Sequence, residues 1–267
     1  MTAAALQSHS LLPLLEVRDL SVHFGGLRAV EKLNFSVEKG EIFGLIGPNG
    51  AGKSTCFNSL CGAVRPTSGK VLLSGENITQ QPPHQIARKG LARTFQLTSI
   101  FGQMTVGENL VAAMHIHREE GFLSALLKTN SYRSEQVRLR EEAQRILKFL
   151  KLSHLYGRKS SLASFAEQRW LEIGIALALK PQMLLLDEPA AGLSPTETHA
   201  LADLIREINA TGVTVLLIEH NMKFVMSICR RVCVLNYGQK HAEGSPEAVV
   251  ANPAVKEIYL GSENKDA

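Results

Sequence analysis

The chain has 267 residues, enough for one large domain or for one core with an inserted subdomain. Its composition, 45% hydrophobic and 20% charged, is that of an ordinary globular protein and excludes a disordered or fibrous chain. The formal net charge of +4 is small for this length and does not by itself indicate nucleic-acid binding. The four cysteines form no CxxC pair, so we expect buried, reduced thiols rather than a zinc site or a disulfide framework.

Targeting and membrane segments are not expected either. The first residues lack a basic stretch followed by a full apolar segment, as a secretory leader would have. No run approaches the roughly 18 apolar residues that a membrane helix needs. We therefore expect that the chain does not cross a bilayer by itself.

The first part of the chain has strand patterns. Apolar residues from 15 to 24 follow a broken period of two, which is typical of a half-buried antiparallel strand, and residues 33–37 repeat it. Residues 42–46 are apolar almost throughout and lead into a glycine-rich loop. Helical spacing follows at residues 57–61. These patterns predict two antiparallel strands and then a buried strand that leads into a helix.

The middle of the chain has a helical pattern. Residues 105–108 form a capping box ahead of apolar residues, and residues 137–150 combine helical spacing with many charges. We therefore predict a helical subdomain at roughly 100–170, inserted in a single domain that spans residues 1–267. Within it, residues 119–134 are a mixed connection, either a surface loop or a short irregular helix.

Strands and helices alternate in the last third. Residues 183–186 and 213–218 are continuous apolar runs, as in a parallel sheet that is covered on both faces. Between them, residues 194–197 read Ser-Pro-Thr-Glu, which predicts a helix start with an N-cap serine and proline at the first helical position. The predicted fold class is α/β, with an antiparallel β addition and a helical subdomain.

The strongest functional motif is a phosphate loop, residues 47–54, which matches GxxxxGK[ST] between a strand and a helix. Its glycines let the backbone wrap a phosphate chain, so that N–H groups and the helix N-terminus face the anion. Lys53 would reach the β- and γ-phosphates, and Ser54 would bind Mg²⁺. The predicted nucleotide-binding residues here are Gly47, Pro48, Asn49, Gly50, Ala51, Gly52, Lys53, Ser54 and Thr55.

Two adjacent carboxylates follow the apolar run that ends at residue 186. A lone acidic pair after a strand is more often a helix start, but a phosphate loop in the same chain favours phosphate chemistry. At the carboxyl end of a strand in an α/β sheet, Asp187 would hold Mg²⁺ through water. Glu188 would polarise the attacking water.

The order of strand, phosphate loop, helical insertion, strand with Asp-Glu-Pro and a later histidine resembles the ATPase domain of ABC transporters over nearly the whole chain. The resemblance implies an ABC-type ATPase core with ATP and Mg²⁺ as cofactors. Gln96 resembles the Q-loop glutamine, which contacts Mg²⁺ and relays nucleotide state to a membrane subunit. His220 resembles the switch histidine that contacts the γ-phosphate. Without the family, Gln96 is only a polar residue near a strand, and His220 is as readily a capping or core histidine.

Three further positions acquire roles from this resemblance. Phe24 stands where the family places an aromatic that stacks on adenine, with core packing as the alternative. Residues 163–167, Ala-Ser-Phe-Ala-Glu, stand at the signature loop, which is usually close to LSGGQ or LSYGE. Ser164 and Ala166 would face the ATP of a partner chain. Ala166 replaces a glycine, so its Cβ is expected to crowd that γ-phosphate unless the change is neutral drift.

A narrower resemblance rests on residues 86–96, on Met104 to Val106 and on the tail at residues 252–261. These segments are similar to the larger ATPase subunit of branched-chain amino-acid importers. The resemblance implies a head-to-tail dimer with a second ATPase subunit, a heterodimer in that family. It also implies two transmembrane permease subunits, an external solute-binding protein and a peripheral place on the cytoplasmic face of the inner membrane.

Other functions remain open at this point. An importer for urea or amides would have the same motifs. A soluble ABC-type clamp acting on nucleic acid or ribosomes would also have them, but such proteins usually carry coiled-coil or tandem-domain additions, and we expect no nucleic-acid partner. A P-loop kinase would transfer the phosphate to an acceptor other than water, and the Q-loop and switch-histidine motifs argue against it.

Overall fold

The structure is a computed structural model that describes residues 12–94, 100–115 and 130–263. The first elements are β1 Leu15–Phe24, β2 Leu27–Val37, β3 Ile42–Ile46, α1 Lys53–Leu60, β4 Ser68–Leu73, β5 Glu76–Asn77, α2 Pro83–Arg88 and β6 Leu91–Arg93. The helical middle contains α3 Val106–Met114, α5 Asn130–Phe149, η2 Ser153–Leu155, η3 Ser160–Leu162 and α6 Phe165–Leu177. The last elements are β7 Met183–Asp187, α7 Pro195–Ala210, β8 Thr214–Ile218, α8 Met222–Ile228, β9 Arg231–Asn236, β10 Gln239–Gly244, α9 Pro246–Ala251 and α10 Pro253–Glu263.

The central sheet has six strands in the order β10-β9-β3-β8-β7-β6. Neighbouring strands from β9 to β6 pair in parallel, and β10 joins the edge antiparallel. The strands predicted at residues 42–46 and 183–186 are confirmed as β3 and β7, and the one predicted at 213–218 is confirmed as β8, which begins at Thr214. The predicted α/β fold class is therefore confirmed.

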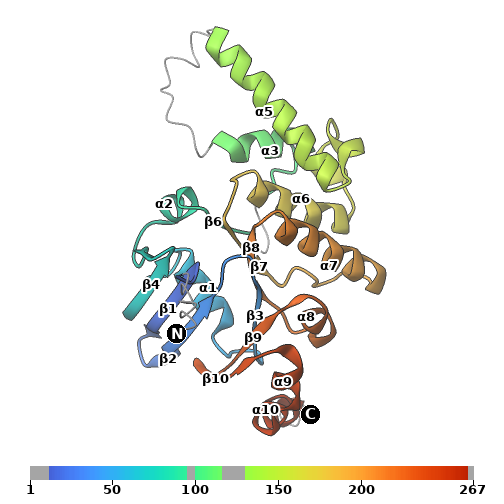
Figure 1. Cartoon of the computed structure of the whole chain (residues 1–267). Coiled ribbons are helices and arrows are strands. Elements are labelled where there is room, and N and C mark those ends of the chain that lie inside the picture. Colours follow the sequence, from blue (N-terminus) through green and yellow to red (C-terminus); the bar gives the residue numbers. More distant parts are fainter. Residues whose placement is uncertain (1–11, 95–99, 116–129, 264–267) are drawn as a thin grey trace, which may run out of the picture.

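The antiparallel addition is a second sheet in the order β2-β1-β4-β5. The strand predicted at residues 15–24 is confirmed as β1. The predicted second strand is also present, but β2 begins at Leu27, well before residue 33. Its first two buried residues, Val30 and Leu33, stand three positions apart, so the apolar period of two is interrupted there. Figure 1 shows this sheet, with α1, on one side of the central strands.

Side chains of the central strands alternate between two hydrophobic cores. Ile42 and Ile46 of β3 belong to the core that α3, α5, α6, α7 and α8 cover. Phe43 and Leu45 belong to the other core, together with residues of β1, β2, β4 and α1. Successive residues of a strand point to opposite faces, so a strand covered on both faces must be apolar throughout. This is why β3, β7 and β8 read as continuous apolar runs.

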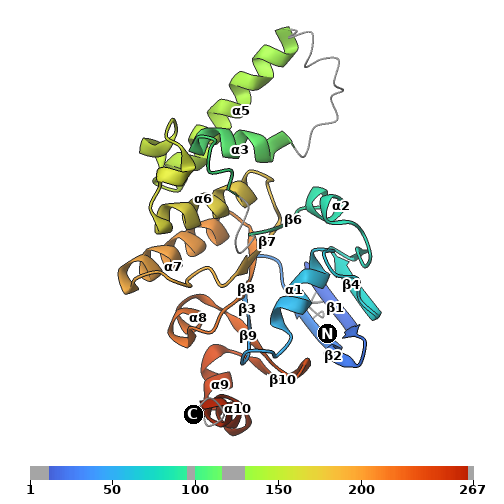
Figure 2. The same cartoon turned by 180° about the vertical axis from the view of Figure 1, so that it is seen from behind.

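The helical middle extends away from the central sheet, as Figures 1 and 2 show from opposite sides. The capping box of Thr105 and Glu108 is confirmed at the start of α3. The helix predicted at 137–150 is confirmed as α5, which begins earlier, at Asn130. Residues 130–134 of the predicted connection are thus helical, and residues 119–129 lie in the part of the chain that is not described. The bounds of a helical subdomain at 100–170 stay a prediction, because α6 runs on to Leu177.

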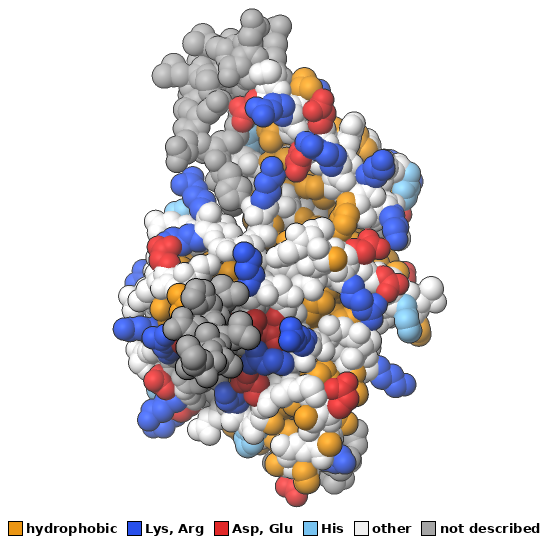
Figure 3. Space-filling model, viewed as in Figure 1, with side chains coloured by type: hydrophobic (Ala, Val, Ile, Leu, Met, Phe, Trp, Pro, Cys, Tyr) orange, Lys and Arg blue, Asp and Glu red, His pale blue; other side chains and the backbone are white. Residues whose placement is uncertain are grey.

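Two expectations from composition can be compared with the structure. All four cysteines are buried and free, as expected. Among residues 12–94, 100–115 and 130–263, no helix is long and apolar enough to span a membrane. On the face shown in Figure 3, basic and acidic side chains are interspersed, in keeping with the small net charge.

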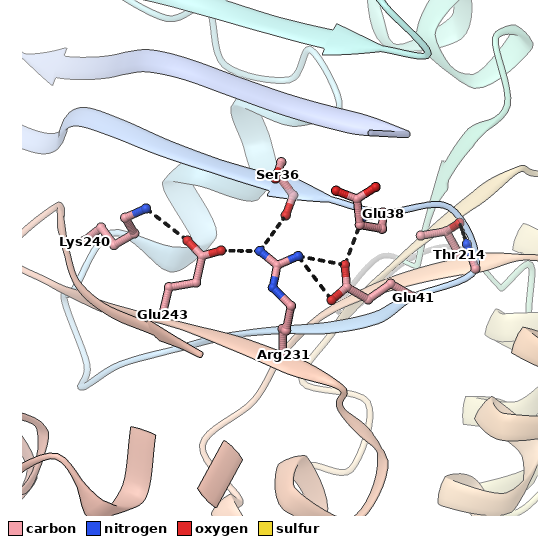
Figure 4. A network of polar contacts seen from close by, with 8 residues as sticks. Ser36, Glu38, Glu41, Thr214, Arg231, Lys240 and Glu243 are labelled. Carbon is pink, nitrogen blue, oxygen red and sulfur yellow. Dashed lines mark hydrogen bonds and ion pairs between the residues drawn. The ribbon is translucent and has the colours of Figure 1, made fainter. Parts of the chain in front are cut away.

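A network around Arg231 joins the two sheets (Figure 4). From β9, the guanidinium lies 3.2 Å from the carboxylate of Glu41, which precedes β3, and it pairs with Glu243 of β10. It also donates to the carbonyl oxygen of Ser36 in β2 at 3.5 Å and stacks over the ring of Phe43 at 5.2 Å. Burial raises the pKa of Glu41, while Arg231 acts in the opposite direction. The guanidinium therefore balances a carboxylate that the fold removes from water.

We predict that Arg231→Met lowers the free energy of unfolding by about 2–3 kcal/mol, because the buried Glu41 loses its counter-charge. This loss is smaller than the roughly 3–5 kcal/mol expected for breaking a fully buried pair, because the Arg231 side chain is 29% exposed. Urea denaturation followed by circular dichroism measures it. Adding Glu41→Gln to this variant should restore part of the loss, and a single variant as stable as the parent protein would contradict a stabilising role.

Candidate nucleotide-binding and catalytic site

The phosphate loop joins the carboxyl end of β3 to the N-terminus of α1. Gly47 and Gly52 have φ angles of 152° and 100°. A Cβ on Gly47 would lie 2.2 Å from the carbonyl oxygen of Leu235, and one on Gly52 would lie 2.3 Å from that of Ala29. Both positions therefore require glycine, for conformation and for space. The loop holds its shape because β9 and β2 pack directly against it.

Lys53 is buried inside this loop, with 6% of its surface exposed. Its ammonium group donates to the carbonyl oxygens of Gly47 and Pro48, at 2.7 and 2.9 Å. Burial lowers the pKa of Lys53, and the carboxylates of Glu188 and Asp187 act in the opposite direction. The cation is thus held at the centre of the loop, where the phosphate chain of a nucleotide would lie.

Phe24 ends β1 and pairs with Leu27 across the β1–β2 hairpin. Phe24 is 51% exposed, so the alternative of core packing does not hold. The same hairpin reaches the phosphate loop, because Ala29 of β2 lies against Gly52. The hairpin that reaches the loop therefore also carries an accessible aromatic ring, while the contact of Phe24 with adenine stays a prediction.

The second part of the site lies at the carboxyl ends of β7 and β8. Asp187 is the last residue of β7 and is 3% exposed. Glu188 follows in the left-handed region, with φ 47°, and its N–H donates to the carbonyl oxygen of Ile218 at 3.0 Å. Its carboxylate lies 3.3 Å from Nε2 of His220, which comes from the loop after β8. Strained backbone of this kind persists only where the surrounding structure imposes it, and it is frequent at functional sites.

His220 and Glu188 are therefore neighbours in space, as both predicted roles require. The His220 side chain is 47% exposed, which excludes the alternative of a core histidine. The position of Gln96 relative to Glu188 and His220 is not given, because residues 95–99 lie outside the described part of the chain. Its role as Q-loop glutamine and Mg²⁺ contact stays a prediction.

Arg93 is a site residue whose role the sequence did not reveal. From the end of β6, its guanidinium pairs with Oδ2 of Asp187 at 2.7 Å, and its side chain is 10% exposed. It also donates to the side chain of Asn58 in α1 and lies over the ring of Phe57 at 5.9 Å. The one feature of the sequence that points to this role is that Arg93 ends a short apolar strand. Its partner stands 94 positions away, so pattern reading could not supply it.

Mg²⁺ fits the oxygen atoms at this place. Oδ1 of Asp187 is buried and accepts no hydrogen bond from the described residues, so one carboxylate oxygen remains for a cation or its water. Ser54 is an exposed residue in the first turn of α1. The described residues contain no group of three or more His, Cys, Asp or Glu that could hold a metal. Mg²⁺ commonly binds through one or two carboxylates together with phosphate oxygens and water, so this donor set suits it.

The signature loop leads into α6, with Ser164 as the N-cap. The hydroxyl of Ser164 accepts from the N–H of Glu167 at 3.3 Å, and the Glu167 carboxylate accepts from the N–H of Ser164 at 2.7 Å. The backbone hydrogen bond lowers the pKa of Glu167. Ala166 is the second residue of the helix, a position that alanine occupies without strain. The described chain thus accommodates its Cβ, and crowding of a partner's ATP stays a prediction.

Taken together, the phosphate loop between a strand and a helix, the acidic pair after β7 and the parallel sheet define a P-loop nucleotide-binding protein. The sequence profile of the ABC transporter family matches residues 30–191. A second profile, described as branched-chain amino acid ATP-binding cassette transporter, matches residues 242–264.

Curated relatives match almost end to end. The high-affinity branched-chain amino acid transport ATP-binding protein BraF of Pseudomonas aeruginosa is 45% identical over 93% of this chain and 98% of its own length. LivG of Escherichia coli, which carries the same description, is 46% identical over the same shares. A probable LivG from Archaeoglobus fulgidus is 37% identical over 96% of this chain and 98% of its own length.

Solved structures agree with this result. A nucleotide-free ATP-binding cassette from an ABC transporter superposes with a TM-score of 0.82 at 35% identity, covering 93% of this chain and 99% of that one. The ADP conformation of an ABC-transporter cassette gives a TM-score of 0.81 at 35% identity, with 94% and 99% coverage. The chain therefore belongs to the ABC transporter family, as an ATP-binding and ATP-hydrolysing subunit.

We expect Glu188→Gln to bind ATP normally and to hydrolyse it about 10²–10⁴ times more slowly, because only the water-polarising carboxylate is lost. Nucleotide affinity by calorimetry and phosphate release by a coupled assay separate the two effects. Glu197→Gln, at the exposed start of α7, is a control that removes a carboxylate outside the site. Near-normal turnover of Glu188→Gln would contradict the assigned role.

Lys53→Ala should instead weaken ATP binding by about 10- to 100-fold, because a charge-assisted contact to phosphate is lost. Calorimetric titration with ATP measures this. Lys39→Ala removes an exposed lysine from the turn ahead of β3, at the other end of that strand, and should leave the affinity unchanged. Unchanged affinity in Lys53→Ala would show that its ammonium group does not contact the nucleotide.

Proposed function

We propose that this chain is the ATP-hydrolysing motor subunit of an importer for branched-chain or other neutral amino acids. The observation that carries the proposal is the match with BraF and LivG, at 45% and 46% identity over 93% of this chain and 98% of either relative. The branched-chain cassette profile at residues 242–264 supports it independently, since it lies outside the general ATPase match at 30–191.

The proposed reaction is transfer of the γ-phosphoryl group of ATP to water. The backbone N–H groups of the phosphate loop and Lys53 bind the β- and γ-phosphates. Glu188 orients and polarises the attacking water, and His220 contacts the γ-phosphate. The 3.3 Å contact between these two side chains supports a shared target. Phe24, exposed at the end of β1, stacks on adenine.

Ser54, Asp187 and Gln96 would hold Mg²⁺, which supplies charge neutralisation to the phosphates when bound. The buried Oδ1 of Asp187, which accepts no hydrogen bond from the described residues, supports this assignment. The pairing of Oδ2 with Arg93 fixes the carboxylate so that Oδ1 keeps one orientation. The solved ADP conformation of a similar cassette supports nucleotide binding in general.

We propose a head-to-tail dimer with a second ATPase subunit, in which Ser164 and Ala166 face the partner's nucleotide. Their place at the exposed N-terminus of α6 supports this, because backbone N–H groups at a helix start favour anions. Two transmembrane permeases and an external solute-binding protein complete the proposed importer. The chain would then be peripheral on the cytoplasmic face of the inner membrane.

The cargo is tested by genetics. Deleting the gene should abolish high-affinity uptake of radiolabelled leucine or a related neutral amino acid, and the unaltered gene should restore it. The same gene carrying Glu188→Gln should not, because the subunit would assemble but would not turn over. Uptake of radiolabelled urea serves as the control and should be unaffected. Loss of urea uptake with all neutral amino acids unaffected would move the assignment to the urea or amide class.

A further inference from the structure

Glu219 is a buried carboxylate to which the reaction outlined above gives no role. It follows β8 directly and is 2% exposed. A carboxylate removed from water costs free energy unless it is paired or accepts hydrogen bonds. Its place between β8 and the switch histidine is therefore unusual for a purely structural position, where an apolar residue would continue the strand.

Three backbone N–H groups compensate for this burial. Oε1 accepts from the N–H of Ala190 at 2.8 Å. Oε2 accepts from the N–H groups of His220 and Asn221, at 3.1 and 3.3 Å. Burial raises the pKa of Glu219, and these hydrogen bonds act in the opposite direction. One side chain thus joins the loop after β7 to the loop after β8.

Each of these two loops carries one of the proposed catalytic groups. Glu188 stands two residues before Ala190, and His220 is itself one of the residues that Glu219 holds. β7 and β8, labelled at the centre of Figure 1, pair in parallel, so their carboxyl ends lie at the same edge of the sheet. The hydrogen bonds of Glu219 therefore join the loop that carries Glu188 to the loop that carries His220.

The backbone around Glu188 shows why such a restraint is needed. Its φ of 47° lies in the left-handed region, which costs about 1–3 kcal/mol for a residue with a side chain. The bond from its N–H to Ile218 fixes the chain on one side. The bond from Ala190 to Glu219 fixes it on the other. Asn221, also held by Glu219, caps α8 by accepting from the N–H of Phe224 at 3.2 Å.

We propose that Glu219 is a positioning residue for ATP hydrolysis, which holds the loops after β7 and β8 together so that Glu188 and His220 reach the same γ-phosphate. The inference rests on the roles proposed for those two residues. It requires a carboxylate, because two acceptor oxygens meet N–H donors from two directions. An amide has only one acceptor oxygen and must turn its NH₂ group toward one of the two loops.

The test is Glu219→Gln, which keeps size and shape. We expect kcat for ATP hydrolysis to fall about 10- to 100-fold, because a small displacement of catalytic groups has such an effect on rate. KM and calorimetric ATP affinity should stay unchanged, because the phosphate loop is untouched. Glu41→Gln is the matched control, since it removes another buried carboxylate, 3% exposed, beside the opposite end of the sheet. That control should lower the unfolding temperature but leave kcat as it is.

A double-mutant cycle with His220→Ala distinguishes positioning from general loosening. If Glu219 acts through His220, adding Glu219→Gln to His220→Ala should lower kcat much less than it does alone. Where His220→Ala leaves no measurable rate, the imidazole resonance of His220, assigned by its loss in that variant, gives a second readout. We expect this resonance to shift in Glu219→Gln and to be unchanged in Glu41→Gln.

An unchanged kcat in Glu219→Gln would overturn the proposal, as would an equal loss in Glu41→Gln or fully additive effects with His220→Ala accompanied by an unshifted imidazole resonance. The test of the positioning role can be distinguished from the test of the proposed function. If Glu188→Gln and His220→Ala slow hydrolysis as expected while Glu219→Gln does not, only the positioning role fails. If Glu188→Gln is itself fully active, the catalytic assignment fails first.

Discussion

The parallel pairing of β3, β8 and β7 is the constraint on which the site depends. The three strands are adjacent in the central sheet and run in the same direction, so their carboxyl ends meet at one edge. The phosphate loop follows β3, Glu188 follows Asp187 at the end of β7, and the switch histidine lies in the loop after β8. The order of the strands therefore brings together functional residues that are far apart in the sequence, as in other open α/β sheets.

Holding those strands together requires burial on both faces, and the two cores provide it. Because β3, β7 and β8 send alternate side chains into different cores, a change of register by one residue would exchange the two sets. The register of β7 against β8 also determines where the loops after these two strands begin relative to each other. Asp187 is paired with Ile218, so the residues that follow, Glu188 and Glu219, begin at the same level. The packing of the two cores, through the strand register, thus determines which side chains can meet at the carboxyl ends of the strands.

Sequence patterns predicted the site loops and the central strands correctly, because both depend on residues that are close together in the sequence. A phosphate loop needs glycine at Gly47 and Gly52, and a strand buried on both faces is continuously apolar, so both leave local traces. The start of β2 left none, because the apolar period of two is interrupted between Val30 and Leu33. The pairing of Arg93 with Asp187 and the contacts of Glu219 with Ala190 join positions 94 and 29 apart. Such contacts follow from strand order, which local periodicity does not contain.

Electrostatics at the site is arranged so that each buried charge has a fixed partner before a nucleotide enters. Lys53 is held by two loop carbonyls, Asp187 by Arg93, and Glu219 by backbone N–H groups. Fixed dipoles and charges of this kind need not reorganise when charge develops on the phosphate oxygens, which is the main source of electrostatic catalysis. The strained backbone at Glu188 fits the same principle, because the energy of holding the carboxylate in place is provided by folding rather than during the reaction. Stability elsewhere in the chain, above all in the two cores, is what makes such an arrangement possible.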